Sequence, residues 1–414
     1  MCLTALRRSK AKPLIVSNAR PVLLRRAFLA AIFTCFCVSA ASQATDYHFG
    51  VYPAGRNDGI TDVPGVLISH VTKIEGNGRL QPGIGPVRTG ATAIFPNADP
   101  WNHKVSAGAF AYNGNGEMSG THWVNESGFL ETPIVLTDTL DVGRADDGVV
   151  SWMIRRYPSI GVRDDVPLPV VAECDDQALN DIQGRHVTES DIGSLLERAR
   201  PGQFARGSVG AGTGMRAFGF KAGIGSASRV LPKAQGGYTV GVLVNDNTGS
   251  SRRLLSIDGV HIGEKLRNEL LPIFPRSDSF VPRGRAQDGS IIVITATDAP
   301  LDGRQLRALA KRSVLGMARV GLTSDVGSGD LLLAFSTTYR YDRDAQQNVT
   351  APPKPFVEDP DTLDELYGAA VEATEAAIYD ALFSAQTMTG RDGITFYGLP
   401  RQRVLQMLQH RASQ

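Results

Sequence analysis

Cysteine is scarce in this chain, and most of what there is lies near the N-terminus. Of the four cysteines in 414 residues, Cys2, Cys35 and Cys37 precede residue 40, and only Cys174 follows. A single remaining cysteine excludes an intrachain disulfide after residue 44, and it excludes a metal cluster built on thiolates. Cys174 could be a nucleophile, but a small, buried, apolar residue is the expected role.

An excess of one charge sign is also absent. Lys and Arg number 43, Asp and Glu number 42, and the formal net charge is +1. This balance gives no electrostatic reason to expect nucleic acid or an acidic surface as a partner. The chain is 42% hydrophobic and 21% charged, which is typical of a globular protein with a large core. Its 44 glycines indicate many tight turns and a fold rich in β-strands.

Long apolar runs are missing after the N-terminal region. Seven Lys or Arg residues precede an apolar run at 27–41, which is too short to span a bilayer comfortably, and 42–44 fit a small-x-small cleavage pattern. Arg25 and Arg26 begin a weak twin-arginine pattern, although an ordinary secretory signal explains them equally well. We predict an export signal over residues 1–44, and a periplasmic or secreted protein that does not stay inserted in the membrane.

Buried strands and amphipathic helices alternate along the rest of the chain, with no internal repeat and no linker between domains. This mixture predicts layers of helix and sheet around one core. Thr188, Asp361 and Gly321 are the expected helix caps. The glycine-dense segment 207–225 is expected to be rich in turns. The predicted strands are 66–71, 91–95, 105–112, 134–137, 168–173, 238–244, 290–295 and 331–337, and the predicted helices are 148–157, 188–200, 302–320 and 362–385.

The strand that begins at Ser290 is the most informative part of the sequence. A polar segment at 268–289, with three prolines and little periodicity, ends in Gly289, and a β-branched run follows at 291–295. Such a run predicts a buried strand with Ser290 at its first position. The exposed segment before it is a plausible processing site inside one domain. A Gly-Ser pair at an ordinary strand start explains the same residues without any chemistry.

A cut between Gly289 and Ser290 would give Ser290 chemical competence. A serine hydroxyl is a weak nucleophile that needs a base. The cut would free an α-amino group, whose pKa of about 7.7–8.0 suits a general base. A glycine at position 289 fits this chemistry, because only glycine freely adopts the unusual backbone angles that would let the Ser290 hydroxyl attack the Gly289 carbonyl.

Two other polar segments are candidate site elements. The loop 113–123 is rich in glycine, so its backbone could approach a ligand closely, although a plain hairpin loop fits it too. It lacks the pattern of a phosphate-binding loop. Residues 245–249, an Asn-rich run after a buried strand, could place amide donors near a substrate carbonyl, or could form a simple turn.

Several segments, in order, resemble the L-aminopeptidase/D-esterase family, also called the DmpA-type or β-aminopeptidase family. The likeness extends over nearly the whole mature chain, and the number and order of the matches make it specific. The matching segments are 59–65 (GITDVPG), 113–123 (NGNGEMSGTHW), 170–173 (VVAE), 179–181 (LND), 212–215 (GTGM), 220–230 (FKAGIGSASRV), 289–293 (GSIIV), 296–301 (ATDAPL) and 328–330 (SGD).

The resemblance implies an α+β fold, a four-layer αββα sandwich like that of amino-terminal nucleophile hydrolases. It also implies a precursor that cuts itself before Ser290, giving a larger chain of about 45–289 and a smaller chain of 290–414 in one domain. Family members release N-terminal L-, D- or β-amino acids from short peptides, amides or esters. They need no metal or other cofactor, and they tend to form homo-oligomers of the paired chains.

The resemblance also assigns roles to individual residues. Ser290 matches the nucleophile, and Asn247 matches an oxyanion-hole asparagine. Ser328 and Asp330 match a serine and an acidic residue that relay protons or orient the nucleophile, although some members have Glu in place of Asp330. A carboxylate must also recognise the free amino group of the substrate. For that role we expect Glu173 first and Glu117 second, and each could instead be a structural hydrogen-bond acceptor.

One position departs from the family pattern. Members often have an aromatic residue, commonly Tyr, shortly after the residue that matches Glu173, and this chain has Asp175 there. A carboxylate cannot donate the hydrogen bond that a phenol can. A binding protein that kept the fold and lost the chemistry is therefore one alternative. An unprocessed serine hydrolase with a histidine base is another, although no G-x-S-x-G motif surrounds Ser290. His122 is one candidate base.

Overall fold

The computed structural model describes residues 48–249, 251–275, 289–342 and 358–412. The predicted export signal lies outside these residues, and so does 276–288, most of the polar segment before Ser290. Within the described residues, no helix combines the length and the apolar character needed to cross a membrane.

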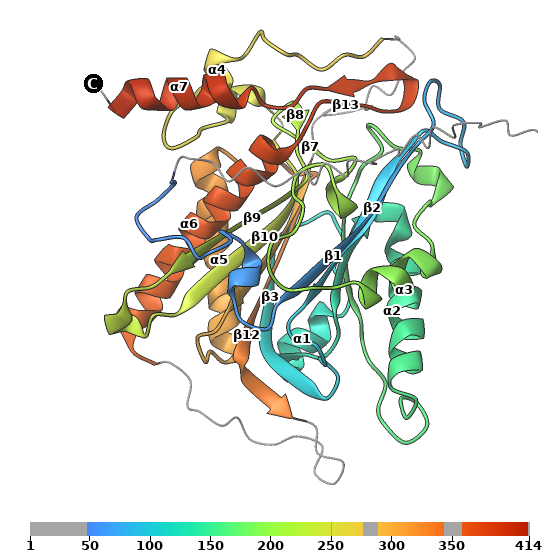
Figure 1. The fold of residues 1–414 in the computed structure, drawn as a ribbon, viewed down its shortest axis with the longest axis vertical. Helices are drawn as coiled ribbons and strands as arrows, with labels where there is room; N and C mark the ends of the chain where they lie inside the picture. Colours follow the sequence, from blue (N-terminus) through green and yellow to red (C-terminus); the bar gives the residue numbers. More distant parts are fainter. Residues whose placement is uncertain (1–47, 250, 276–288, 343–357, 413–414) are drawn as a thin grey trace, which may run out of the picture. The chain divides into compact units, whose positions relative to one another are not determined.

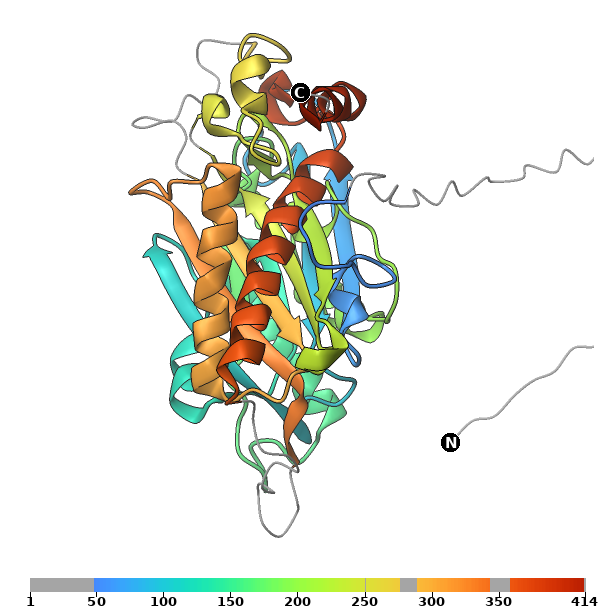
Figure 2. The same ribbon diagram turned by 90° about the vertical axis from the view of Figure 1, so that its left-hand side faces the viewer.

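Two β-sheets stack face to face between two pairs of helices, which confirms the expected αββα arrangement. The smaller sheet has the strand order β1-β2-β5-β6, and the larger has the order β4-β3-β12-β11-β10-β9. In Figure 1, α5 and α6 lie on one side of the sheets, and α2 and α3 lie on the other. Figure 2 shows α5 and α6 side by side across the larger sheet.

The elements have the following bounds. The smaller sheet contains β1 (Leu67–Glu75), β2 (Val87–Phe95), β5 (Ile134–Asp138) and β6 (Val170–Cys174). The larger contains β3 (His103–Gly114), β4 (Phe129–Leu130), β9 (Ile224–Val230), β10 (Thr239–Asn247), β11 (Ser290–Thr297) and β12 (Gly329–Asp342). Two small hairpins pair β7 (Arg216–Ala217) with β8 (Phe220–Lys221), and β13 (Met388–Thr389) with β14 (Thr395–Phe396). The helices are α1 (Thr121–Ser127), α2 (Val142–Arg156), α3 (Glu189–Glu197), α4 (Ile262–Lys265), α5 (Gly303–Val320), α6 (Pro360–Ser384) and α7 (Arg401–Ala412).

Three large apolar clusters fill the three interfaces between the four structural layers. One cluster joins the larger sheet to α5 and α6, a second lies between the sheets, and a third joins the smaller sheet to α2 and α3. Strand β11 contributes to two of them, because Ile291 and Val293 face the helices while Ile292 and Ile294 face the other sheet. A central strand covered on both faces must be apolar throughout, which explains the unbroken β-branched run. By the same alternation, Ser290 faces the space between the sheets.

Local sequence signals placed the start of α3 and the end of α5 correctly, although α3 ends at Glu197 rather than 200. Helix α3 follows Thr188, whose side chain forms a capping box with Asp191. Helix α5 follows Asp302 and ends at Gly321, whose φ of 100° suits glycine. Both signals involve residues within one helical turn of the cap, so they can be recognised from sequence alone.

Several boundaries differ from the expectations, and four of the differences have a clear reason or bear on the site. Helix α6 is capped by Asp359, not by Asp361, because Pro360 is tolerated in the first turn and the helix starts earlier. Helix α2 begins at Val142 rather than 148, although it contains glycines. A Cβ on Gly148 would lie 2.7 Å from the Cβ of Ile192, so this glycine lets α2 and α3 pack closely. Strand β10 continues through Asn247, and the loop 113–123 ends in α1.

Candidate active site

Ser290 lies in the middle of a row of three residues at one end of the larger sheet. It pairs with Asn247 of β10 in antiparallel register and with Gly329 of β12 in parallel register. The serine is 6% exposed, and its Oγ is buried without a hydrogen-bond partner among the described residues. A buried hydroxyl without a partner is costly, so its position needs an explanation.

The peptide before Ser290 is held by its neighbours on both sides. The backbone N–H of Gly329 donates to the Gly289 carbonyl at 3.2 Å. A Cβ on Gly289 would lie 2.3 Å from the carbonyl oxygen of Asn247. The expectation of unusual backbone angles at Gly289 stays a prediction, because its φ depends on residue 288, outside the described residues. Glycine is needed here for the close approach of β10.

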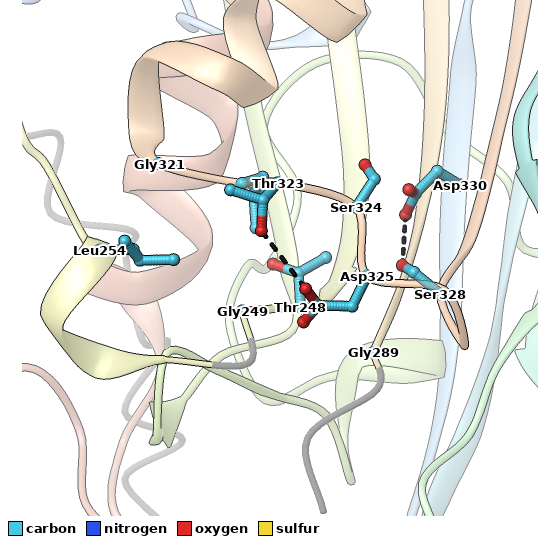
Figure 3. A pocket seen from close by; sticks show the side chains of 11 residues that line it. Thr248, Gly249, Leu254, Gly289, Gly321, Thr323, Ser324, Asp325, Ser328 and Asp330 are labelled. Atoms are coloured by element: carbon cyan, nitrogen blue, oxygen red, sulfur yellow. Dashed lines mark hydrogen bonds between the residues drawn. The ribbon is translucent and has the colours of Figure 1, made fainter. Parts of the chain in front are cut away.

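Ser328 and Asp330 form a hydrogen-bonded pair beside this peptide. The Ser328 hydroxyl donates to Asp330 Oδ1 at 2.7 Å, and both residues are buried. Burial raises the pKa of the Asp330 carboxyl, and neighbouring hydroxyls, that of Ser328 among them, oppose the rise. Figure 3 shows the pair next to Gly289, on the wall of a pocket of about 310 Å³ including its open space. The pair is therefore in place to exchange protons next to Ser290.

Asn247 is fixed by two hydrogen bonds from its side-chain amide. Its Nδ2 donates to the backbone carbonyl of Asp175 at 2.8 Å, and its Oδ1 accepts from the backbone N–H of Arg216 at 3.2 Å. An amide nitrogen has two protons, so one remains to donate elsewhere. The side chain that matches the family's oxyanion-hole asparagine is thus rigid and keeps a spare donor.

Glu173 is a buried carboxylate at the end of β6. It is 4% exposed, its Oε1 accepts from the Glu117 backbone N–H at 3.0 Å, and its Oε2 accepts from the Thr139 hydroxyl. Burial raises its pKa, and these two hydrogen bonds oppose the rise. A Cβ on Gly116 would lie 3.1 Å from Glu173 Oε1 and 3.3 Å from Gly329 Cα, so Glu173 is close to the Ser290 row.

Glu117 contributes to this region through its backbone. Its side chain is exposed, and no described residue holds its carboxylate. The structure therefore brings together Ser290, Asn247, Ser328, Asp330 and Glu173, and it leaves the Glu117 carboxylate outside this cluster.

The aspartate at the usually aromatic position does not point its charge at Asn247. The Asp175 carboxylate accepts from the backbone and side-chain N–H groups of Gln177 at 2.8 and 2.6 Å, and only its backbone carbonyl contacts Asn247. Burial raises the pKa of Asp175, while the Gln177 backbone donor and the nearby charge of Arg216 lower it.

Two buried groups near the site were missed or only partly described by the sequence. Cys174 is fully buried, as expected, and its thiol lies near Ser290; burial raises the thiol pKa well above its usual value. Asp246 is also fully buried, and Thr248 donates to it at 2.5 Å. Burial, with a contribution from the charge of Asp330, raises the pKa of Asp246 to about 7. A strand that extends through 245–247 would have revealed Asp246, but these residues favour turns.

A histidine base for Ser290 finds no support. No described residue, histidine included, forms a hydrogen bond with Ser290 Oγ. His122 is exposed on α1, and His186 pairs with Asp181 at 2.9 Å. The described residues also contain no group of three or more His, Cys, Asp or Glu side chains placed to hold a metal ion.

Comparison with known proteins gives consistent matches over most of the chain. The model of peptidase family S58 matches residues 58–396. A β-peptidyl aminopeptidase, BapA, from Sphingosinicella microcystinivorans is 40% identical over 362 residues, which cover 86% of this chain and 88% of that protein.

Two solved structures share the fold. A β-aminopeptidase from a Burkholderia species has a TM-score of 0.77 and 38% identity. An L-aminopeptidase D-Ala-esterase/amidase from Ochrobactrum anthropi, described as a variant of the Ntn hydrolase fold, has a TM-score of 0.78 and 36% identity. Each covers 88% of this chain and 96% of its own. The expected amino-terminal nucleophile hydrolase fold is therefore confirmed.

Proposed function

Since the chain belongs to peptidase family S58 and is an aminopeptidase like its relatives, we propose that it is an exported enzyme that cuts itself between Gly289 and Ser290. The new terminal Ser290 then releases N-terminal residues from short peptides, amides or esters. The non-catalytic alternative loses its basis, because the chain keeps both the peptidase family pattern and a buried, unpartnered Ser290 hydroxyl.

The self-cleavage begins with attack of Ser290 Oγ on the carbonyl carbon of Gly289. The C–N bond breaks, the Ser290 nitrogen takes the hydroxyl proton, and Gly289 is left as an ester on Oγ. Water then hydrolyses the ester, which frees the Gly289 carboxylate and restores the hydroxyl. The Gly329 N–H, already bonded to the Gly289 carbonyl oxygen, supports the negative charge that develops there.

Substrate turnover uses the same nucleophile, Ser290 Oγ, and its general base is the α-amine that the cut has freed. The freed α-amine of Ser290 accepts the hydroxyl proton as Oγ attacks the substrate carbonyl. The amine then gives this proton to the leaving amine or alcohol as the scissile bond breaks, and water hydrolyses the ester on Oγ to release the N-terminal residue. The spare N–H of Asn247 supports the oxyanion, and such a donor contributes roughly 2.7–4 kcal/mol in a transition state. The Ser328–Asp330 pair orients the amine and relays its proton.

Glu173 is the group that we assign to the substrate's free amino group. It is a buried carboxylate that lies close to the Ser290 row across Gly116, and burial makes its attraction for an ammonium group stronger than it would be in water. The β-peptidyl specificity named for BapA makes β-amino acids the first N-terminal residues to test.

The Ser290 hydroxyl at the start of β11, buried and without a hydrogen-bond partner among the described residues, is the observation that carries this proposal. Intact-mass analysis tests it. The wild type should give two chains, the smaller beginning at Ser290, whereas Ser290→Ala should stay at one mass and lose activity by at least roughly 10³-fold.

Ser226→Ala is the matched control. Ser226 is a buried serine of β9 in the same sheet, and its hydroxyl donates to the Val242 carbonyl at 2.6 Å, so this variant should still be cut. An active wild-type preparation with no new terminus at Ser290 would refute the mechanism.

Two further parts of the proposal have separate tests. N-terminal sequencing of protein recovered from the periplasm or the medium should show that residues 1–44 have been removed. Light scattering of the processed protein should show a homo-oligomer of chain pairs. A monomeric pair would refute the second expectation without affecting the catalytic one.

A further inference from the structure

Arg216 stands next to the side chain that we assign to the oxyanion hole. Its backbone N–H donates to Asn247 Oδ1 at 3.2 Å, and Asn247 pairs with Ser290 in the larger sheet. Its guanidinium lies over the ring of Phe396, 5.7 Å from the centroid, and a cation over an aromatic face at this distance is held in orientation. The backbone of Arg216 is therefore anchored beside the Ser290 row, and its side chain is held against Phe396.

The guanidinium of Arg216 interacts with the charge of Asp175 only at a distance. Among the described residues, the guanidinium has no hydrogen bond and no ion pair. Arg88, by contrast, donates to five acceptors, and Arg391 pairs with Asp392 at 3.1 Å. These two arginines have partners within the protein, whereas Arg216 keeps its donors for another acceptor.

Asp175 does not take up these donors. The Asp175 carboxylate is held by Gln177, and it forms neither a hydrogen bond nor an ion pair with Arg216. Arg216 is partly exposed, so a ligand can reach its side chain, although burial lowers its pKa. An arginine side chain presents a planar fork of N–H groups that matches a carboxylate.

We propose that the Arg216 guanidinium binds a carboxylate of the substrate, so that this enzyme prefers short peptides with a negative charge close to the scissile bond. The carboxylate is either the free C-terminus of a dipeptide or the side chain of an acidic N-terminal residue. This inference rests on the proposed function, because it assumes that substrate is bound at Ser290.

Paired substrates that differ only in this charge test the proposal. The first pair is β-alanyl-leucine and its C-terminal carboxamide, and the second is aspartyl and asparaginyl p-nitroanilide. In the wild type, at least one charged substrate should have a kcat/KM about 10- to 100-fold above its neutral partner, mainly through KM. Arg216→Leu should abolish that ratio, and Arg216→Lys should restore part of it. The affected pair identifies which carboxylate binds.

Arg304→Leu is the control, since it removes the same charge from an arginine that is 72% exposed. Arg304 is near the start of α5, and Gly321, on the wall of the pocket beside Gly289, follows the other end, about 27 Å away. This variant should keep the wild-type ratio. Equal losses on charged and neutral substrates in Arg216→Leu would mean that Arg216 is only structural, and unchanged ratios would also overturn the proposal. Failure of the wild type to cleave any of the four substrates would instead count against the proposed function.

Discussion

Two clusters of buried polar groups are built on the larger sheet, and they differ in how completely they are satisfied. At Arg206, the guanidinium donates to Asp380 and to the backbone carbonyls of Asn57, Asp58 and Ser226. Both oxygens of Asp380 have donors. In the Ser290 row and beside it, Ser290 Oγ, Asp330 Oδ2 and Asp246 Oδ2 have none among the described residues.

The difference separates structural polar groups from functional ones. Leaving a buried polar group without a partner costs about 1–3 kcal/mol, so a cluster that only holds the fold together should avoid it. In the Arg206 cluster, which ties residues 57–58 to α6, one buried atom, Arg206 Nε, lacks a partner among the described residues, while every carboxylate oxygen of Asp380 has a donor. The Ser290 row breaks this rule in several places, which is expected where atoms must be free to react.

The largest contrast should appear in stability. Arg206→Met leaves Asp380 buried without its cation, and we expect it to lower the free energy of unfolding by about 3–5 kcal/mol. Ser290→Ala removes a hydroxyl that has no partner, so it should change stability by less than about 1 kcal/mol. Urea unfolding measures both. A lower free energy of unfolding for Ser290→Ala than for Arg206→Met would contradict this distinction between structural and functional polar groups.

The pH dependence of stability should sharpen the contrast between the two clusters. Asp246 has a pKa of about 7 in the folded protein, above the value of about 3.9 expected when unfolded. Between these pH values Asp246 holds a proton in the folded state but not in the unfolded state. Its contribution to stability is therefore largest below pH 4 and falls as the pH rises to about 7. In the uncut Ser290→Ala background, Asp246→Asn should remove about 2–4 kcal/mol of this fall.

Asp364→Asn, on the exposed face of α6, is the control for that experiment and should leave the pH dependence in place. Urea unfolding at several pH values gives the comparison. A pH profile that is the same with and without Asp246 would show that this carboxyl does not titrate in the stated range.

The smallest expected effect concerns substrate binding. Glu173→Gln replaces the buried carboxylate by a neutral amide, and we expect KM for substrates with a free amino group to rise roughly 10- to 100-fold, with a smaller change in kcat. Glu117→Gln, at an exposed side chain, should change KM by less than about threefold. If KM is unchanged in Glu173→Gln, another group recognises the amine.

Much of the fold follows from local sequence patterns. The β-branched run after Ser290 and the caps of α3 and α5 involve residues within a few positions of one another, and the structure confirms them. Resemblance to a known family added the layer order and the candidate residues, which no local pattern could supply.

The rest depends on contacts between distant segments. Asn247 and Asp246 belong to β10 only because β11, more than 40 residues later, pairs with them, and this pairing overrides the turn preference of Asn and Asp. Arg216 lies in a glycine-dense segment that indicates turns and nothing more. Its contact with Asn247, 31 residues away, appears only in the folded chain.

The order of strands in the larger sheet has a consequence for the proposed cut between Gly289 and Ser290, which would give an N-terminal and a C-terminal fragment. Strands β11 and β12, from the C-terminal fragment, lie between β3 and β10 of the N-terminal fragment. The C-terminal fragment would thus lie between two parts of the N-terminal fragment. It could dissociate only if the β3–β12 and β10–β11 pairings were both broken. The folded state of the cut protein should persist. Refolding after denaturation, however, would be a bimolecular reaction between two chains and would slow on dilution. Unfolding of the cut protein should therefore be practically irreversible in dilute solution.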